Sequence, residues 1–546
     1  MTLGRDELQE ALAECLDVEE RDVQEFLESE NRELRVLAAV AVARTGIRRA
    51  LDATVRLAQE HGYRDQASVS AAERLAGLSD IDEPFIRLLK AIGIQAAQAG
   101  NVAPAMQYLQ QATTRGAVSG QRRDKRSRAN IRYGHDREID AAIASLAQHF
   151  RAPRMAVPPI EPFRIVITCS GIQDEDGPTV VITKRAEHFK RLGMDVRIVS
   201  TGGSETNSPS KLARLHERGI PFFHPPAGDA VQRVQWLIEH FDKHPAHAIT
   251  WTTSLYDNIG KLAATIGLAP VQAWENRSLE PFIGKFDLVF QSVDKRQEEI
   301  TEWPGISKYY GGSSLMADEI DAALPMARSS LGVPEDAILL GTFGRMEKCN
   351  TTPYLDALSL ALKADARAWL VLAGRDALGA VAAMSARFGA EGVLDRVRFL
   401  GPRQSDGPAL VKTIDIYCDT YPWVGGQTLL DAMQGARPIV AMKPAADAAL
   451  DPTGISSITS TAEALLGDLF ELARPGDAQD YARIALRYIG DPALRARDGA
   501  AAYAKVKRDY DPFDKSARYA SDLRAIMSKK MGVGAPQDFR TINVNS

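Results

Sequence analysis

The sequence predicts an α/β protein with two doubly wound parallel sheets, preceded by an all-α region. From residue 163 onward, short β-branched apolar runs alternate with helical segments, which is typical of buried parallel strands joined by crossover helices. The alternation restarts after residues 331–334 (LGVP), which indicates two consecutive Rossmann-like units. Residues 1–150 show apolar residues at helical spacing instead. We therefore expect domains at residues 1–150, 160–325 and 326–530.

Size and composition agree with a multidomain globular protein. The chain has 546 residues, of which 45% are hydrophobic and 25% charged, and its formal net charge of −5 gives no indication of nucleic-acid binding. The amino terminus lacks the apolar segment of a signal peptide, and no run approaches the roughly 18 apolar residues of a transmembrane helix. The sequence therefore predicts a cytoplasmic protein and leaves open whether it forms a homo-oligomer. The cysteines form no CxxC pair, which predicts reduced thiols: Cys15, Cys169, Cys349 and Cys418.

The amino-terminal region contains one segment with repeat-like spacing. Residues 89–93 lead to Gly100 and then to Ala105, Tyr108 and Ala112, at positions where a tetratricopeptide repeat packs its two helices. A single tetratricopeptide repeat and an ordinary helical hairpin both explain this pattern. The basic stretch at 115–137 is typical of a solvated loop, and contact with an anionic partner is the alternative.

The predicted strands place the ligand site. In doubly wound sheets, ligands bind beyond the carboxyl ends of the strands, so two such units predict an active site in the cleft between them. The first unit has predicted strands at 163–169, 195–200, 248–253, 271–274 and 288–293. The second has them at 337–343, 368–372, 397–400, 414–418 and 438–442.

Three segments of the second unit carry candidate binding residues. After its first strand, Arg345 and Lys348 lie three positions apart, so both can face a diphosphate. A later strand leads into residues 419–428 (DTYPWVGGQT) and a helix, where backbone N–H groups can hold phosphate oxygens and Asp431 can accept hydrogen bonds from ribose. A third segment, residues 399–404, is placed to reach the base. The candidate contacts in this third segment are Pro402, Arg403 and Gln404. Those of the glycine turn are Gly425, Gly426, Gln427 and Thr428.

These segments carry a family resemblance. Residues 344–348, the LGP loop at 400–402, residues 419–433 and the closing segment 518–527 resemble the protein O-GlcNAc transferases and the related bacterial cytoplasmic N-glycosyltransferases. Those enzymes join a helical, often tetratricopeptide, domain to a core of two Rossmann-like domains called GT-B. The resemblance implies a nucleotide-diphosphate sugar, UDP-linked, as donor substrate and no further cofactor. It also implies that Lys348 contacts the diphosphate, residues 426–428 the phosphates, Asp431 the ribose and residues 402–404 the base.

One departure from larger GT-B families bears on the stereochemistry. Retaining families place a Glu eight residues before the ribose acid, and this chain has Trp423 there, which favours inverting transfer. Inverting chemistry usually needs a base on the first unit. The candidates are the carboxylates of residues 174–176, above all Asp176, then His224, and Glu275 as a further alternative. The His, Asp and Glu residues form no metal triad, so we expect leaving-group stabilisation by cations and a helix dipole instead of a metal.

The leading hypothesis is an inverting glycosyltransferase acting on protein side chains, with the helical domain selecting the acceptor. One alternative is a lipid-linked or polysaccharide acceptor, for which the basic segment 184–191 would offer membrane contact. The other is a non-catalytic binding protein with a degenerate transferase fold. Retention of Lys348, the GGQT turn and Asp431 favours an enzyme.

Overall fold

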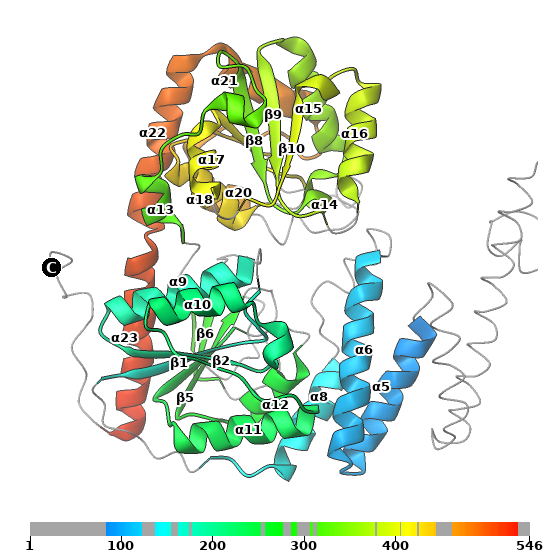
Figure 1. Ribbon diagram of the computed structural model, residues 1–546, viewed down its shortest axis with the longest axis vertical. Coiled ribbons are helices and arrows are strands. Elements are labelled where there is room, and N and C mark those ends of the chain that lie inside the picture. The colour runs from blue at the N-terminus through cyan, green and yellow to red at the C-terminus, as the bar shows by residue number, and fades with distance from the viewer. Residues whose placement is uncertain are drawn as a thin grey trace, which may run out of the picture. The chain divides into compact units, whose positions relative to one another are not determined.

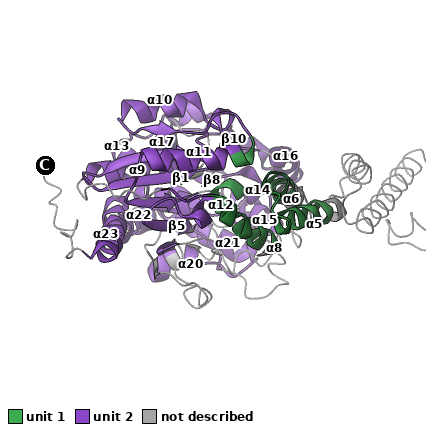
Figure 2. Cartoon of the chain, turned by 90° about the horizontal axis from the view of Figure 1, so that it is seen from below, with its two compact units in different colours: residues 1–150, 229–231, 255–262 green, residues 151–228, 232–254, 263–546 purple. Residues whose placement is uncertain are grey.

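The computed structural model confirms the predicted fold class (Figure 1). It describes residues 83–122, 137–153, 162–173, 177–252, 257–276, 286–291, 306–309, 314–376, 379–403, 406–422, 425–443 and 461–532. The chain divides into two compact units (Figure 2). Unit 1 comprises residues 1–150, 229–231 and 255–262, and unit 2 comprises residues 151–228, 232–254 and 263–546.

Unit 1 is helical throughout its described part before residue 150. Its helices are α5 (Glu83–Gln98), α6 (Val102–Arg122) and α8 (Arg137–Leu146). Helices α5 and α6 form a hairpin whose turn contains Gly100 at a φ of +76°, and a Cβ atom on Gly93 would lie 2.7 Å from Leu109 Cδ2. Leu109, Ala105 and Ala112 are buried and Tyr108 is half-buried, and whether the hairpin is a tetratricopeptide repeat stays a prediction. The basic stretch also begins as helix, because α6 continues to Arg122.

A buried ion pair holds unit 1 together. Lys261 Nζ lies 2.5 Å from Asp140 Oδ1, and the two side chains are 3% and 2% exposed. Next to it, Asn258 Nδ2 donates a hydrogen bond to Thr113 Oγ1 at 3.0 Å. Removing one partner of a buried pair leaves an uncompensated charge in a medium of low dielectric constant, which is strongly destabilising.

We therefore expect Asp140→Ala to lower the free energy of unfolding by about 3–5 kcal/mol, because Lys261 stays buried without its carboxylate. Chemical denaturation of both proteins measures this difference. Asp356→Ala is the matched control, since Asp356 forms a comparably short pair with Arg387 at an exposed position. The decrease in the free energy of unfolding caused by Asp356→Ala should stay below about 1 kcal/mol. Equal losses for the two variants would contradict a special role of the buried pair.

The first sheet of unit 2 has seven parallel strands in the order β3-β2-β1-β4-β5-β6-β7. Helix α23 returns to this sheet from the carboxyl-terminal end of the chain, and Tyr519 of α23 forms a 3.0 Å hydrogen bond with Thr250 of β4. The strands are β1 (Arg164–Cys169), β2 (Asp195–Ser200), β3 (Phe222–Phe223), β4 (Ala248–Trp251), β5 (Val271–Asn276), β6 (Leu288–Gln291) and β7 (Ile306–Tyr309). The helices are α9 (Gly177–Arg191), α10 (Pro209–Glu217), α11 (Ala230–Lys243), α12 (Asn258–Ile266) and α23 (Pro512–Met531). Residues 230–231 of α11 and 258–262 of α12 belong to unit 1.

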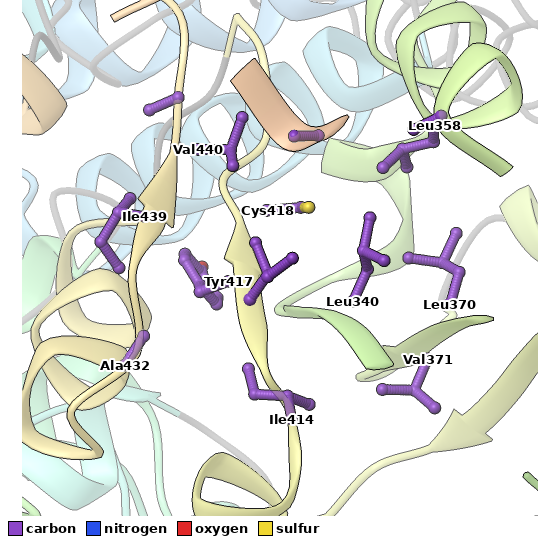
Figure 3. Close-up of a cluster of buried hydrophobic side chains, with 14 of the residues drawn as sticks. Leu340, Leu358, Leu370, Val371, Ile414, Tyr417, Cys418, Ala432, Ile439 and Val440 are labelled. Carbon is purple, nitrogen blue, oxygen red and sulfur yellow. The ribbon is translucent and has the colours of Figure 1, made fainter. Parts of the chain in front are cut away.

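The second sheet has five parallel strands in the order β10-β9-β8-β11-β12. Its core is an apolar cluster in which Leu340, Leu370 and Tyr417 from three adjacent strands are fully buried (Figure 3). The strands are β8 (Ile338–Phe343), β9 (Ala368–Ala373), β10 (Val397–Gly401), β11 (Ile416–Cys418) and β12 (Ile439–Val440). The helices are α13 (Ala317–Ala322), α14 (Met346–Cys349), α15 (Thr352–Ala364), α16 (Ala380–Ala390), α17 (Gly407–Thr413), α18 (Gly426–Gln434), α20 (Thr461–Leu466), α21 (Ala478–Gly490) and α22 (Pro492–Asp509).

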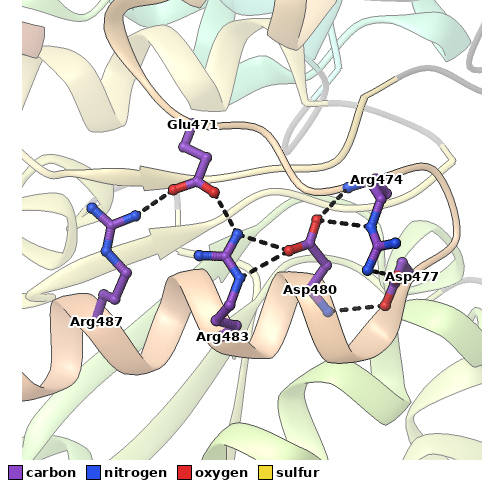
Figure 4. A network of polar contacts seen from close by, with 6 residues as sticks. All are labelled: Glu471, Arg474, Asp477, Asp480, Arg483 and Arg487. Carbon is purple, nitrogen blue, oxygen red and sulfur yellow. Dashed lines mark hydrogen bonds and ion pairs between the residues drawn. The ribbon is translucent and has the colours of Figure 1, made fainter.

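A network of charged side chains surrounds the start of α21 (Figure 4). Glu471 pairs with Arg483 and Arg487, and Asp480 pairs with Arg483 and Arg474. Exposed pairs of this kind contribute little singly, but they and the Asp477 cap define where the helix begins. Tyr481, which follows Asp480 in α21, is buried, and its hydroxyl lies 3.0 Å from the carbonyl oxygen of Asp419. The network thus stabilises a helix that contacts the carboxyl end of β11.

Candidate functional site

The second sheet has one point at which the strand order reverses. Strands β9 and β10 lie on one side of β8, and β11 and β12 lie on the other. In doubly wound sheets the ligand crevice lies beyond the carboxyl ends of the two strands at such a switch point. Here those strands are β8 and β11, and the described residues that follow them are 344–349 after β8 and 419–422 and 425–428 after β11. The structure therefore brings together the two segments that the sequence analysis selected separately.

Glycines allow the loops after β8 and β9 to approach closely. Gly374 has a φ of +157°, and a Cβ atom there would lie 1.6 Å from the carbonyl oxygen of Gly344. The Gly344 N–H donates to the Ala373 carbonyl at 2.9 Å, and the Met346 N–H donates to the Arg375 carbonyl at 3.0 Å. The two loops thus form one hydrogen-bonded rim. Arg345 and Arg375 are both exposed on this rim, and the sequence analysis identified only Arg345.

Lys348 lies in the short helix α14, and its side chain is half-buried. Loss of solvent lowers the pKa of Lys348 below its ordinary value, and the neighbouring Arg345 guanidinium lowers it further. The carboxylate of Asp419 acts in the opposite direction. A cation that is partly withdrawn from water and placed beside a second cation is stabilised when an anion binds. Lys348 is therefore suited to contact a diphosphate.

The start of α18 supplies backbone donors at the same edge of the sheet. Its N-cap residue is Gly425, which has no side chain to cap the helix, and the first helical bond runs from the Leu429 N–H to the Gly425 carbonyl at 2.8 Å. The N–H groups of residues 426–428 consequently have no acceptor within the helix. Together with the positive end of the helix dipole, they form an arrangement that favours phosphate.

Two predicted contact residues use their side chains within the protein. The Thr428 hydroxyl lies 2.8 Å from the Tyr417 hydroxyl and donates to the Gly425 carbonyl. Gln427 Nε2 donates to Asp431 Oδ1 at 2.8 Å, one helical turn further along. For both residues the backbone N–H is therefore the group available to a phosphate. The side chain of Gln427 orients the predicted ribose acid instead.

Asp431 is half-buried on α18. Withdrawal from solvent raises the pKa of its carboxyl to about 7, although the hydrogen bond from Gln427 opposes this shift. The ionised form of a carboxyl in such a position is stabilised by hydrogen-bond donors, such as the hydroxyls of a ribose. The role of Asp431 as ribose contact stays a prediction.

Asp419, the first residue after β11, lies in the selected segment 419–428, but the sequence analysis assigned it no contact of its own. It is 1% exposed, and its Oδ1 atom accepts the Gly425 N–H at 3.0 Å. Burial raises the pKa of this carboxyl to about 7, against the effects of the Gly425 N–H and of Lys348. The sequence feature that could have identified Asp419 is its position, because an acid directly after a buried strand at the switch point lies at the edge of the sheet where ligands bind.

The predicted base-contact segment follows β10, the edge strand of this sheet. Arg403 Nη1 lies 2.7 Å from Asp406 Oδ2, so its guanidinium is held within its own loop. Pro402 is exposed beside it, and Gln404 lies outside the described residues. The Gly374 N–H donates to the Gly401 carbonyl at 2.9 Å, which connects this loop to the rim formed after β8 and β9.

The candidate bases belong to the first sheet. Asp176 lies outside the described residues, as do its neighbours 174 and 175. His224 follows the edge strand β3, two strands from the switch point between β1 and β4, and its Nδ1 lies 2.9 Å from the Pro225 carbonyl oxygen. Glu275 is 5% exposed and pairs with Arg185 at 3.3 Å, so it serves a buried ion pair. The assignment of Asp176 or His224 as the catalytic base stays a prediction.

The described ranges contain no group of three or more His, Cys, Asp or Glu side chains arranged to hold a metal ion. Within the same ranges, no helix combines the length and apolar character needed to cross a membrane.

Comparison with known proteins identifies the fold. No protein-family model and no curated sequence matches the chain. Solved structures do match: Anabaena Alr3699/HepE in complex with UDP and glucose has a TM-score of 0.51 at 18% identity, covering 66% of this chain and 99% of that one. A mutant of the Thermobaculum terrenum O-GlcNAc transferase has a TM-score of 0.51 at 17% identity and covers 90% of this chain and 99% of its own. Sucrose-phosphate synthase from Thermosynechococcus elongatus has a TM-score of 0.52 at 14% identity, covering 67% and 100%. The chain thus has the two-sheet GT-B fold that these proteins share.

Proposed function

We propose that this protein is a glycosyltransferase that takes its sugar from a nucleotide-diphosphate donor, most simply a UDP-sugar. The observation that carries the proposal is the placement of Lys348 after β8 and of the uncapped start of α18 after β11, the two strands at the switch point of the second sheet. The structural neighbours support it, since one is a complex with UDP and glucose and another is an O-GlcNAc transferase.

In the proposed reaction, the acceptor attacks the anomeric carbon while the bond from that carbon to the diphosphate oxygen breaks. Negative charge then develops on the departing diphosphate. Lys348 and the N–H groups of residues 426–428 stabilise this charge, and Asp431 holds the ribose. The absence of a Glu at position 423 supports an inverting displacement, in which Asp176 or His224 receives the acceptor proton.

We propose a protein side chain as acceptor, with the helical region of unit 1 as the selecting element. The alternative, a lipid-linked acceptor, relied on cations of α9 for membrane contact, and those cations have partners inside the protein. Lys184 pairs with Glu319, Lys190 donates to the carbonyls of residues 218 and 219, and Arg191 lies over the ring of Phe513. Lys190 and Arg191 are exposed, but these contacts within the chain compete with a membrane surface for the charge of α9.

The direct test supplies the purified full-length protein with a panel of UDP-sugars and measures released UDP. We expect turnover with at least one donor, and a folded protein that neither binds UDP nor consumes any donor would reject the enzyme. A labelled form of the active donor, added to lysate from cells lacking this protein, then reports the acceptor. Label in the protein fraction supports protein glycosylation, whereas label confined to the lipid fraction contradicts it.

A further inference from the structure

Asp419 occupies an unusual position between the two halves of the proposed donor site. Its Oδ1 atom accepts the N–H of Gly425, which begins α18, and its charge interacts with Lys348 on α14. Its Oδ2 atom is buried and has no hydrogen-bond partner among the described residues. An ionised carboxylate normally hydrogen-bonds through both oxygens when it is buried, whereas a protonated carboxyl has fewer acceptor sites to satisfy.

Hydrogen bonds from the Thr420 backbone and the Tyr417 side chain stabilise the Asp419 carboxylate, but burial outweighs them and its pKa stays raised to about 7. Burial raises the pKa of the Cys349 and Cys418 thiols to about 12. It also raises the phenolic pKa of Tyr417 and Tyr481 well above the ordinary value, so all four groups are neutral near pH 7. Among the groups of the described chain that influence the Asp419 pKa, Lys348 is the cation. Asp431 on α18 is the other acid of this edge, and it interacts with the same Tyr417.

We propose that Asp419 is a positioning residue which links Lys348 to the phosphate-binding turn and takes up a proton when a nucleoside diphosphate binds. This inference rests on the proposed function. A diphosphate beside Lys348 adds negative charge close to the Asp419 carboxylate, and this favours the protonated form of that carboxyl. A proton from the solvent then moves to Asp419, most simply to Oδ2, and no other bond changes. The neutral carboxyl leaves the charge of Lys348 to the diphosphate while Oδ1 still holds Gly425.

Asp419→Asn tests the inference because it keeps an oxygen that accepts the Gly425 N–H and removes the charge. The experiment measures UDP affinity by calorimetry at one pH below and one pH above the value of about 7. Below it, wild type and variant should bind equally, because wild-type Asp419 is already protonated. Above it, the variant should bind UDP more tightly by up to about tenfold. In buffers of different ionisation enthalpy, wild type should take up more protons on binding than the variant does.

Two further variants make the test decisive. Asp419→Ser is neutral and also offers an oxygen to Gly425, so it should reproduce the lost pH dependence if the Asn variant fails to fold. Asp415→Asn is the matched control on the same segment, since Asp415 instead pairs with Arg328 at 2.9 Å, and it should leave the pH dependence of UDP affinity unchanged.

Comparing wild type with Asp419→Asn in this way also cancels the contribution of Asp431, which both proteins retain. Equal weakening of UDP binding at both pH values, with no difference in proton uptake, would reduce Asp419 to a structural role and overturn the inference. Failure of the folded wild type to bind UDP at any pH would instead reject the proposed function itself.

Discussion

Lys348→Ala is expected to lower the turnover of the UDP-sugar by about 10²–10³-fold, because removal of one preorganised charge-stabilising group typically costs about 2.7–4 kcal/mol in the transition state. The structure adds a reason to expect the upper part of this range. Lys348 is partly withdrawn from water and next to Arg345, so it gains from the charge that develops on the departing diphosphate. Steady-state kinetics with the preferred donor, followed through released UDP, measures the effect.

Lys363→Ala is the matched control for this experiment. Lys363 belongs to the same sheet domain but pairs with Glu391 at an exposed position on α15, so turnover should not change. Lys348→Met preserves much of the side-chain volume and separates loss of charge from loss of packing. A decrease below tenfold in a folded Lys348→Ala protein would remove Lys348 from leaving-group stabilisation.

Most of the two-sheet architecture was predictable, because buried parallel strands are continuous apolar runs. The strand predicted at 195–200 matches β2, and the strand predicted at 337–343 begins one residue before β8 and ends with it. Strands β3 and β7 were not predicted. Strand β3 has only two residues. Strand β7, at the edge of its sheet, has the polar pair Ser307 and Lys308 between Ile306 and Tyr309, so neither strand shows such a run.

The candidate site was predictable where it depends on local backbone structure, as at the glycine turn before α18 and in the segment after β8. It was less predictable where side chains from distant segments meet. Glu275 was considered as a base, but its partner Arg185 lies 90 residues earlier in the chain, and only the folded packing of α9 shows the pair. Asp419 was assigned no contact of its own for a similar reason. Its carboxylate contacts Gly425 across a turn and interacts with Lys348 on α14, which follows β8, so its significance depends on the order of the strands.

Asp431→Asn is expected to weaken UDP binding by about 1.5–3 kcal/mol, the usual contribution of a hydrogen bond to a charged group. The substitution keeps the size of the side chain and an oxygen near Gln427 Nε2, so α18 should remain intact. Calorimetry with UDP measures the loss. Inorganic pyrophosphate, which has no ribose, is the matched ligand control: Asp431→Asn should leave its affinity unchanged, whereas Lys348→Ala should weaken it.

The pH dependence gives the same prediction a second, independent readout. Because the pKa of Asp431 is raised to about 7, its carboxylate form prevails only above that pH. The advantage of wild type over Asp431→Asn in UDP affinity should therefore be largest above about pH 7 and should decline as the pH falls through that value and the carboxyl becomes protonated. A comparison of the two proteins at each pH cancels the titration of UDP itself and of Asp419. An advantage that is absent at every pH, in a folded variant, would mean that Asp431 does not contact the nucleotide.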